Sequence, residues 1–533
     1  MSLSLWIDTT PSTSYPSLRG ENAADVAIVG GGITGITAAY LLAREGKSVM
    51  LVEKGRMAMA ETGHTTAHVI EATDADYRDL IKDFGEENAR LNTEAIRSSI
   101  ALIRSLVEEL RIDCGLKAVD GYLYAEEEEH REYLQRQQEY LRQAGIETEW
   151  TDEIPLPFPT VGGVRYRNQY IFHIREYLLA IVEAAAQRGA IFYEDSLVTD
   201  VEGRVVKTAE GNILAQHVLL ATHVPINDRG TLWTKMYETR TYVVAAPIEP
   251  GKVPDALYWD TMFPYHYTRL LETDKGLFLI VGGEDRDVGK EGNDEERYAV
   301  LEEYCRERFG VTSFTHRWSG QINEPADALP FIGESVHGKN IWMSTGYSGT
   351  GMTYGTLSAM LLTDFVLGRE NPYAKLYDPA RKKFGAILEN VVTKATEFPK
   401  RMIEKLTNLD VEAENVDEVE EGEGKIVSME GTKVAAARID GELRLLNPTC
   451  THMGCTVAWN AAEKSWDCPC HGSRFDTHGE VLNGPATAAL SSSCPEMAEA
   501  SPCISRKYGS MTGGSVSAAV RALPAGGMQG SRP

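Results

Sequence analysis

The pattern of apolar and polar positions predicts a strand–loop–helix–strand unit close to the N-terminus. Residues 25–30 (DVAIVG) form a short apolar strand, and residues 36–44 continue with the spacing of a helix. Residues 47–54 (KSVMLVEK) form a second strand that ends at Glu53. Strands that alternate with helices in this way indicate an α/β fold with a parallel sheet.

The loop between the first strand and the helix has the pattern G-x-G-x-x-G, from Gly30 to Gly35. Gly30 allows a tight turn, Gly32 lets backbone amides approach a pyrophosphate, and Gly35 lets the helix pack closely on the strand. Glu53, about 20 residues further on, is placed to accept hydrogen bonds from ribose hydroxyls. The unit therefore predicts a dinucleotide site, without separating FAD from NAD.

Three later stretches favour FAD. Residues 61–68 (ETGHTTAH) follow the second strand, and residues 217–222 (HVLLAT) form a buried type of strand. Residues 340–346 form a strand that leads into residues 347–352 (YSGTGM), a glycine-rich start of a helix that ends at Leu367. The positive end of this helix dipole suits the electron-rich edge of a reduced flavin. The sequence shows no second G-x-G-x-x-G unit for NAD(P)H.

Residues 25–368 resemble the D-amino-acid oxidase and glycine oxidase family of FAD flavoproteins, and residues 327–333 (DALPFIG) match its D-x-x-P-x-I-G signature. The resemblance implies an FAD cofactor and an α/β (α+β) Rossmann-like FAD-binding domain with an interleaved substrate domain. The residues assigned to FAD by the motifs and the resemblance are Gly30, Gly32, Ile33, Thr34, Gly35, Glu53, Lys54, Thr62, Gly63, His64, Thr65, Gly346, Gly349, Thr350, Gly351 and Met352.

The substrate is less clearly indicated. Amino-acid oxidases of this family usually hold the substrate carboxylate with an Arg shortly before the D-x-x-P motif, and Ile322 occupies the matching position here. A carboxylate without a partner in an apolar pocket is costly, which favours an amine or a differently anchored acid. Tyr265, Tyr267 and Arg269 are candidate pocket residues, with Arg269 as an anchor for an acid. A strand with alternating faces explains the same run equally well.

The C-terminal part holds two boxes of cysteine and histidine, residues 450–455 (CTHMGC) and 468–473 (CPCHGS). Zinc fingers favour the pairs C-x(2–4)-C and H-x(3–5)-H, whereas each box here combines a Cys with a His. Mixed boxes suit a two-iron cluster in which one iron is held by two Cys and the other by two His. A zinc site or an empty disulfide knot is the alternative.

The two boxes resemble those of the Rieske iron–sulfur domain. This resemblance implies a small all-β domain with a [2Fe-2S] cluster. Cys450 and Cys468 would bind one iron, and His452 and His471 would bind the other.

Four further positions extend this resemblance. Cys455 and Cys470 match the pair that forms a disulfide between the two cluster loops of respiratory quinol-oxidising Rieske proteins. Ser473 matches a serine that hydrogen-bonds a cluster sulfide, and Phe475 stands where those proteins usually place a Tyr. Loss of a hydroxyl donor near the cluster should lower its reduction potential.

These patterns divide the chain into successive parts. We expect an N-terminal segment (1–24), an FAD-dependent oxidoreductase domain (25–370), a helical connector (371–409), an acidic linker (410–424), a Rieske domain (425–490) and a largely disordered tail (491–533). Within the oxidoreductase domain we expect FAD-binding parts at 25–105, 160–223 and 321–370, and substrate parts at 106–159 and 224–320. Short strands of the Rieske domain are expected at 425–429, 432–439 and 442–446.

Composition narrows the choice of partners. The net charge of −25 disfavours binding to nucleic acid or to anionic membranes. The first residues lack the basic and apolar regions of a secretory signal, and no run approaches the ~20 apolar residues of a membrane span. We therefore expect a cytoplasmic protein without a membrane span.

Together, these features predict a flavin-dependent dehydrogenase or oxidase that acts on CH-NH or CH-NH2 donors. A small amine or amino acid would lose a hydride to FAD, and the electrons would pass through the Rieske cluster to an external acceptor. No catalytic acid or base is assigned. Two alternatives stay open: a donor protein feeds the cluster and the flavin performs a reductive or oxygenase reaction, or the chain is a redox-sensing module without turnover.

Overall fold

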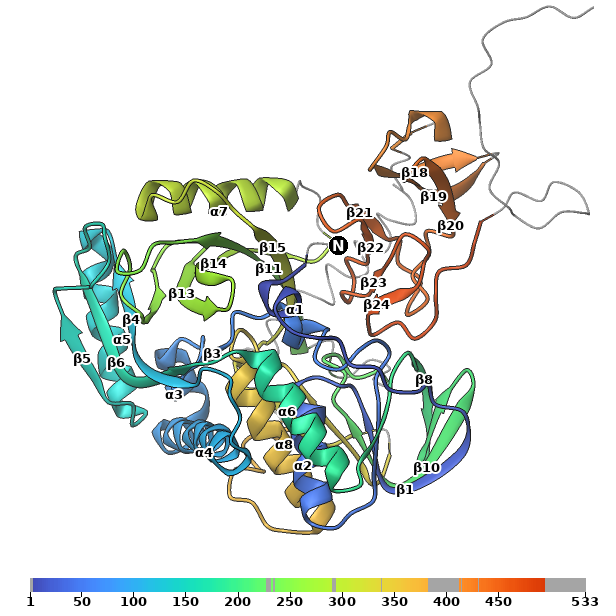
Figure 1. Ribbon diagram of the computed structural model, residues 1–533, viewed down its shortest axis with the longest axis horizontal. Coiled ribbons are helices and arrows are strands. Elements are labelled where there is room, and N and C mark those ends of the chain that lie inside the picture. Colours follow the sequence, from blue (N-terminus) through green and yellow to red (C-terminus); the bar gives the residue numbers. More distant parts are fainter. Residues whose placement is uncertain are drawn as a thin grey trace, which may run out of the picture. The chain divides into compact units, whose positions relative to one another are not determined.

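The computed structural model describes residues 3–226, 232, 235–289, 294–336, 338–381, 412–413, 415–429 and 431–493 (Figure 1). Its elements form the expected FAD-binding fold with mixed sheets and helices, followed by a small all-β domain. Among the described residues, no helix combines the length and the apolar composition that crossing a bilayer requires.

The first sheet contains the predicted dinucleotide-binding unit. β1 (Gly20–Val29) lies parallel to β2 (Val49–Val52) on one side and to β10 (Gly211–Leu220) on the other. β10 also pairs in parallel with β17 (Ile341–Thr345). β1 starts earlier than predicted because its first residues already pair with the start of β10. The remaining described strands of this sheet are β7 (Ile191–Tyr193), β8 (Val198–Glu202), β9 (Val205–Thr208) and β16 (Phe331–Glu334).

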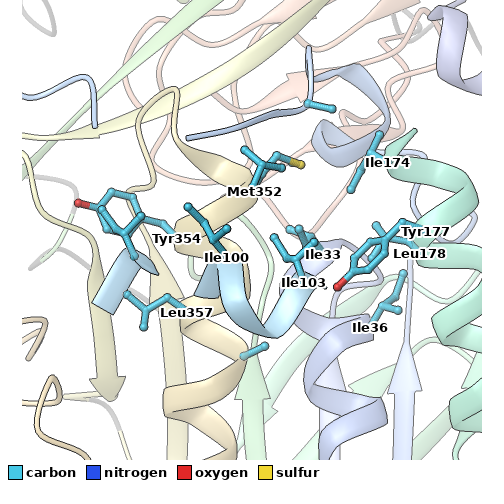
Figure 2. Close-up of a cluster of buried hydrophobic side chains, with 14 of the residues drawn as sticks. Ile33, Ile36, Ile100, Ile103, Ile174, Tyr177, Leu178, Met352, Tyr354 and Leu357 are labelled. Atoms are coloured by element: carbon cyan, nitrogen blue, oxygen red, sulfur yellow. The ribbon is translucent and has the colours of Figure 1, made fainter. Parts of the chain in front are cut away.

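Four helices pack beside this sheet and form the main core. They are α2 (Ile33–Arg44), α4 (Glu86–Leu110), α6 (Ile174–Gln187) and α8 (Gly351–Leu367) (Figure 1). Figure 2 shows Ile33 and Ile36 of α2 close to Ile103 of α4 and Tyr177 of α6, all of them buried. α2 is buried along almost its whole length because α6 and α8 both pack against it. The other described helices are α1 (Leu5–Asp8), α3 (Tyr77–Phe84), α5 (Arg131–Gln143), α7 (Asp294–Phe309), and the short helices η1 (Glu61–His64), η2 (Glu128–His130) and η4 (Val416–Glu418).

The second sheet contains strands from the expected substrate parts, together with two strands from the expected FAD-binding parts. Its strands run in the order β15-β11-β14-β13-β12-β4-β6-β3, and β5 pairs with β6. α7 packs against β11 and β14 (Figure 1). The bounds are β3 (His68–Val69), β4 (Lys117–Ala125), β5 (Thr148–Thr151), β6 (Gly162–Ile171), β11 (Met236–Pro247), β12 (Leu257–Trp259), β13 (His266–Thr273), β14 (Gly276–Asp287) and β15 (His316–Pro325).

The start of β13 is held by a buried histidine. His266 Nδ1 lies 2.8 Å from Asp260 Oδ2, and His266 Nε2 lies 3.4 Å from Glu284 Oε1. The imidazole also stacks on Tyr304, with ring centroids 4.1 Å apart. Burial lowers the pKa of His266, but the hydrogen bonds and charges of the two carboxylates outweigh burial and raise it to about 9. Neighbouring side chains on a strand face opposite ways, so this anchor fixes Tyr265 and Tyr267 toward the other face.

The Rieske part consists of two small antiparallel sheets, drawn in orange to red in Figure 1. β18 (Gly424–Met429), β19 (Thr432–Ile439) and β20 (Glu442–Leu446) match the three predicted strands almost residue for residue. The second sheet contains β21 (Ala458–Asn460), β22 (Ser465–Asp467), β23 (Arg474–Phe475) and β24 (Val481–Asn483). Ser492 forms a bridge with Leu446, so residues just past the expected end of this domain complete it.

Two expected segments contain buried residues that the sequence did not indicate, and two others lie mostly outside the described residues. The N-terminal segment packs into the core, where Trp6 is fully buried and its ring contacts His173. Acids of the acidic stretch such as Glu418 and Glu420 are exposed, but Ala413 and Val419 within it are buried against the first Rieske sheet. Most of the expected connector (371–409) and the tail from residue 494 onward lie outside the described residues.

The His266 anchor gives a pH-dependent prediction. In His266→Gln, Asp260 and Glu284 lose their shared cation, and we expect unfolding to become easier by about 3 kcal/mol at pH 6. The folded pKa of about 9 lies above the ordinary 6.5, so the stabilisation is complete below pH 6.5 and is lost as pH rises through 9. Chemical unfolding followed by circular dichroism between pH 6 and 10 measures the difference from wild type. The matched control is His478→Gln at an exposed position; a difference that does not change with pH would contradict this account.

Candidate functional site

One cavity extends from the glycine loop after β1 to the face of β13 and β15. Of the residues assigned to FAD, those that line this cavity are Gly30, Gly32, Ile33, Thr34, Glu53, Lys54, Thr62, His64, Thr65, Gly349, Gly351 and Met352. Gly35, Gly63, Gly346 and Thr350 are not among the lining residues. The structure thus brings together segments that are far apart in the sequence, as a dinucleotide site requires.

Two glycines make the close approach of strand and helix feasible. Gly30 has a φ of +109°, and a Cβ placed there would lie 2.2 Å from the carbonyl oxygen of Ala221, at the end of β10. A Cβ on Gly35 would lie 1.9 Å from the carbonyl oxygen of Gly30. Any larger residue at either position would push the loop away from the sheet. Gly35 therefore serves the site by packing rather than by lining the cavity.

The first turn of α2 is suited to a phosphate. Gly32 caps the helix without a side-chain hydrogen bond, and the Ile33 amide donates to the Thr62 hydroxyl at 3.2 Å. The positive end of the helix dipole and its unpaired backbone amides attract an anion. Since Gly32 has no side chain, the backbone can approach a pyrophosphate closely. This cradle fits the diphosphate of FAD.

Glu53 holds the glycine loop in place. Its carboxylate accepts hydrogen bonds from the Gly31 amide at 2.7 Å and from the Gly55 amide at 2.9 Å. A carboxylate has about four acceptor sites, so two are left for ribose hydroxyls. The glycine cradle, the helix terminus and this acceptor therefore all fit a bound dinucleotide.

A second helix N-terminus reaches the same cavity. Thr350 caps α8 without a side-chain hydrogen bond, and Gly351 lines the cavity. Gly346, with a φ of +77°, lets the turn before the helix pack on Pro325, whose Cγ would lie 2.6 Å from an added Cβ. The two helix termini place two positive dipole ends along one cavity, which suits a cofactor with both a diphosphate and an electron-rich ring.

The far end of the cavity is aromatic. Tyr265, Tyr267, Trp259 and His68 line it. Tyr267 is held by a 2.7 Å hydrogen bond between its hydroxyl and that of Thr241. Burial lowers the pKa of His68 well below its ordinary value, and the charge of Arg269 adds to the effect, so the imidazole is neutral. Sequence reasoning found the two tyrosines and the stretch 61–68 that contains His68, but it missed Trp259 of β12.

Arg269 does not line the cavity. Its guanidinium donates to the backbone carbonyl oxygens of Ala67 at 2.9 Å and Thr66 at 3.1 Å, and it lies over the ring of Trp6. The side chain is almost fully buried, and burial lowers its pKa to about 9. The structure does not support Arg269 as the anchor of a substrate acid, because its guanidinium is bonded to backbone carbonyl groups and the residue does not line the cavity.

The substrate end of the cavity is lined by an apolar residue and an acid rather than by Arg269. Ile322 lines the cavity at the position where amino-acid oxidases usually have their Arg. Asp74 also lines it, beside Gly349. The Asp74 side chain is exposed to the cavity, but the protein around its carboxyl and the charge of Glu324 outweigh the hydrogen bond from the Gly349 amide and raise its pKa to about 6. This end of the cavity is therefore apolar, aromatic and weakly acidic.

The two cysteine–histidine boxes form loops with the same internal hydrogen bonds. In the first, the Cys450 amide donates to the Cys455 carbonyl at 2.7 Å, and the Gly454 amide donates to the Cys450 carbonyl at 3.0 Å. In the second, the Cys468 amide donates to the Ser473 carbonyl at 2.7 Å, and the Gly472 amide donates to the Cys468 carbonyl at 3.0 Å. Gly454 and Gly472 both have a positive φ, which allows this turn. The boxes are therefore two copies of one local structure.

These loops bring the four expected ligands together. Cys450 and Cys468 are buried and unbridged, and the rings of His452 and His471 lie 4.8 Å apart at an interplanar angle of 89°. The other two cysteines of the boxes, Cys455 and Cys470, form a disulfide between the loops. Two thiols and two imidazoles in facing loops fit a cluster whose irons take different ligands.

Comparison with known proteins agrees with both sites. Residues 25–365 match the model of the FAD dependent oxidoreductase (DAO) family, and residues 410–495 match the Rieske [2Fe-2S] domain. A protein of Bacillus subtilis (strain 168), provisionally named the Rieske 2Fe-2S iron-sulfur protein YhfW, is 34% identical over 91% of this chain and 96% of its own length. The gamma-glutamylputrescine oxidoreductase of Escherichia coli (strain K12) is 26% identical over 66% of this chain and 86% of its own.

Solved structures share the fold. The glycine oxidase of Geobacillus kaustophilus superposes with a TM-score of 0.57 at 20% identity, over 68% of this chain and 99% of that one. Together with the family match, this shows that the chain belongs to the DAO family of FAD-dependent oxidoreductases and carries a Rieske [2Fe-2S] domain. The expected fold class and the two expected cofactors, FAD and the [2Fe-2S] cluster, are thereby confirmed.

Several lining residues lie outside the motifs. Residues of three further segments reach the cavity, and only the stretch 217–222, which includes Ala221 and Thr222, was marked by the sequence. They are Ser196, Leu197 and Val198 before and in β8, Ala221, Thr222 and His223 after β10, and Val481, Asn483, Gly484 and Ala486 of the Rieske domain. The last group is the least expected, because it joins the C-terminal domain to the FAD cavity.

The glycine cradle can be tested by one added methyl group. In Gly35→Ala the new Cβ collides with the Gly30 carbonyl, and we expect FAD affinity to fall by at least about 100-fold, since the loop must leave the phosphate position. Flavin fluorescence after ultrafiltration measures retained FAD. Gly55→Ala is the matched control, because its nearest contact would be an ordinary 3.8 Å. Equal FAD retention by the two variants would refute the packing role of Gly35.

Proposed function

We propose that the protein oxidises a small amine at its C–N bond, and that the electrons leave through the Rieske domain to an external acceptor. When bound, FAD accepts the hydride and the [2Fe-2S] cluster carries single electrons. The observation that carries this proposal is a contact of one side chain, Gln321, with both sites.

Gln321 connects the two cofactor sites. It lies on β15, is nearly fully buried, and lines the FAD cavity. Its Nε2 donates to the carbonyl oxygen of Gly472 at 3.2 Å. Gly472 directly follows His471, a proposed ligand of the cluster. The cavity and the cluster loop are thus separated by a single buried side chain, which supports direct electron exchange within one chain rather than through diffusing partners.

The cavity supports an amine over an amino acid. Ile322 offers no charge to a carboxylate, and Arg269 is engaged with backbone carbonyls. Tyr265, Tyr267 and Trp259 provide aromatic faces, which attract a cation as well as an apolar stem. Asp74 supplies a carboxylate for an ammonium group. The name of the relative from Escherichia coli, an oxidoreductase of gamma-glutamylputrescine, agrees with an amine donor.

The chain's own residues orient such a substrate and exclude water. The hydrogen bond between Thr241 and Tyr267 fixes one aromatic wall, and the close packing of Tyr267 on Gly282 leaves no room beneath the ring. Asp74 binds an ammonium group when it is ionised. Oxidation in this family needs alignment more than acid–base help, so a substrate positioned against these aromatic walls is sufficient.

We also propose the ligands of the cluster. Cys450 and Cys468 would bind one iron, and His452 and His471 the other. The Ser473 hydroxyl, fully buried, accepts from the Ala486 amide at 3.1 Å, which leaves its proton free to point toward the cluster. The fully buried ring of Phe475 provides no such donor.

Replacement of one proposed ligand tests this assignment. In Cys468→Ser we expect the EPR signal of the reduced Rieske cluster to disappear, because a serine hydroxyl does not replace a thiolate on iron. FAD content, measured by absorbance after denaturation, reports whether the fold is intact. Cys305→Ser, at another buried cysteine in α7, is the control and should keep the signal. A full Rieske signal in Cys468→Ser would remove Cys468 from the ligand set.

The substrate class can be tested by anaerobic titration with small amines and with their carboxylate analogues. Amines should bleach the flavin and then produce the Rieske EPR signal, whereas simple acids should do neither.

In Asp74→Asn we expect amine affinity to fall by about tenfold. In wild type it should weaken as pH falls below about 6, where the Asp74 carboxyl gains a proton. Asp79→Asn, at an exposed position of α3, is the control. If only chemically reduced cluster bleaches the flavin, electrons flow in the opposite direction.

A further inference from the structure

We propose that the Rieske domain is a fixed wall of the FAD cavity, so that FAD binding and docking of the Rieske domain stabilise each other. This inference goes beyond electron transfer and depends neither on the substrate nor on the direction of electron flow. Three contacts along one continuous surface support it: the strand β24 with the loop after it, the turn between β21 and β22, and the second cluster loop.

The first contact closes the cavity itself. Val481, Asn483, Gly484 and Ala486 of the Rieske domain line the cavity together with the glycine loop after β1. Hence a ligand that fills the cavity touches both domains. At residues 481–486 the C-terminal domain thus forms part of a cavity that is otherwise lined by the N-terminal part of the described chain.

Hydrogen bonds fix this segment to cavity residues. Asn483 Nδ2 donates to Glu61 Oε1 at 2.6 Å and to Gln321 Oε1 at 3.1 Å. The Lys54 ammonium donates to the carbonyl oxygen of Leu482. Lys54, Glu61 and Gln321 all line the cavity. Three residues, Lys54, Glu61 and Gln321, therefore both line the FAD cavity and hold the Rieske domain, which is the physical basis for coupling.

The second contact is a buried charge pair. Glu463, in the turn between β21 and β22, lies 3.7 Å from the Arg240 guanidinium of β11. It also accepts hydrogen bonds from the Ser319 hydroxyl at 2.6 Å and the Tyr298 hydroxyl at 3.0 Å. All four residues are buried. Removal of one partner leaves a buried charge with fewer counter-charges around it, so the docked position is preferred.

Electrostatics keep this contact ionised. Burial raises the pKa of Glu463, but the charges of Arg240 and Arg474 and the Ser319 hydrogen bond outweigh burial and lower it to about 2. The carboxylate is therefore charged throughout the range in which proteins are stable. Glu463 therefore stabilises the interface at all these pH values and does not act as a pH switch.

The third contact is close packing of the cluster loop. A Cβ on Gly289 would lie 2.7 Å from the backbone of Pro469, which stands between the two cysteines of the second box. A Cβ on Gly472 would lie 2.4 Å from Gln321 Nε2 and 3.2 Å from Glu238. The backbone of Gly289 meets that of Pro469, and Gly472 meets the side chains of Gln321 and Glu238, without room for a methyl group at either glycine. Interfaces that fit this closely match protein interiors rather than transient encounters.

These contacts predict a reciprocal effect. If FAD binds the docked arrangement better than the undocked one, then docking must raise FAD affinity by the same factor by which FAD favours docking. Loosening the interface far from FAD should weaken FAD binding. Conversely, removal of FAD should loosen residues 481–486.

The experiment uses the full chain and needs no substrate. FAD dissociation constants are measured by flavin fluorescence for wild type, Glu463→Gln and Asn483→Ala, with Glu442→Gln as control at an exposed pair within the Rieske domain. We expect at least about tenfold weaker FAD binding in the first two variants and no change in the control. The Rieske EPR spectrum, recorded in parallel, shows that the domain is folded.

A second measurement keeps the inference testable if Glu463→Gln does not fold. Hydrogen exchange of the backbone amides of residues 481–486 is compared between wild-type protein with FAD and the same protein after FAD removal. We expect exchange there to become at least about tenfold faster without FAD, while amides of β19 stay unchanged. Unchanged exchange at 481–486, or wild-type FAD affinity in Asn483→Ala, would overturn the proposal. Either result would leave the proposed amine oxidation untouched.

Discussion

The close approach of β1, β10 and α2 around Gly30 is the constraint on which the FAD site depends. The carbonyl of Ala221 and the first turn of α2 both contact this loop so closely that neither Gly30 nor Gly35 has room for a side chain. The result is a helix N-terminus placed at the carboxyl ends of parallel strands, where dinucleotides bind in such sheets. Glu53 then secures the loop from the neighbouring strand through two backbone amides.

The second sheet converts this general site into a specific one. Its strands bring Tyr267, Trp259 and Ile322 to the far end of the cavity, although the residues lie far apart in the sequence. The His266 anchor on the opposite face of β13 holds the aromatic wall in register. The buried cation Arg269 donates its hydrogen bonds to backbone carbonyl groups and does not line the cavity. The carboxylate of Asp74 does line it.

Local features of both sites could be predicted from the sequence, and contacts between distant segments could not. The glycine loop and the cluster boxes were recognisable because each is a short run whose residues act together, as the matching hydrogen bonds around Cys450 and Cys468 show. The position of Arg269 was not predictable, since its partners are carbonyls of residues 66 and 67. The burial of Ala413 was not predictable, because acidic residues flank it on both sides in the sequence. Asn483 carries no motif, and its role arises only from folding.

The contact between Asn483 and Glu61 also concerns how the protein is made. The two residues are joined by a hydrogen bond but stand near opposite ends of the described chain. During synthesis the N-terminal part emerges first and folds as a unit. The glycine loop and both helix termini are therefore complete while one side of the cavity is still open. If the Rieske domain strengthens FAD binding as proposed, secure retention of FAD begins only after residues near 483 have left the ribosome, long after the glycine loop has folded.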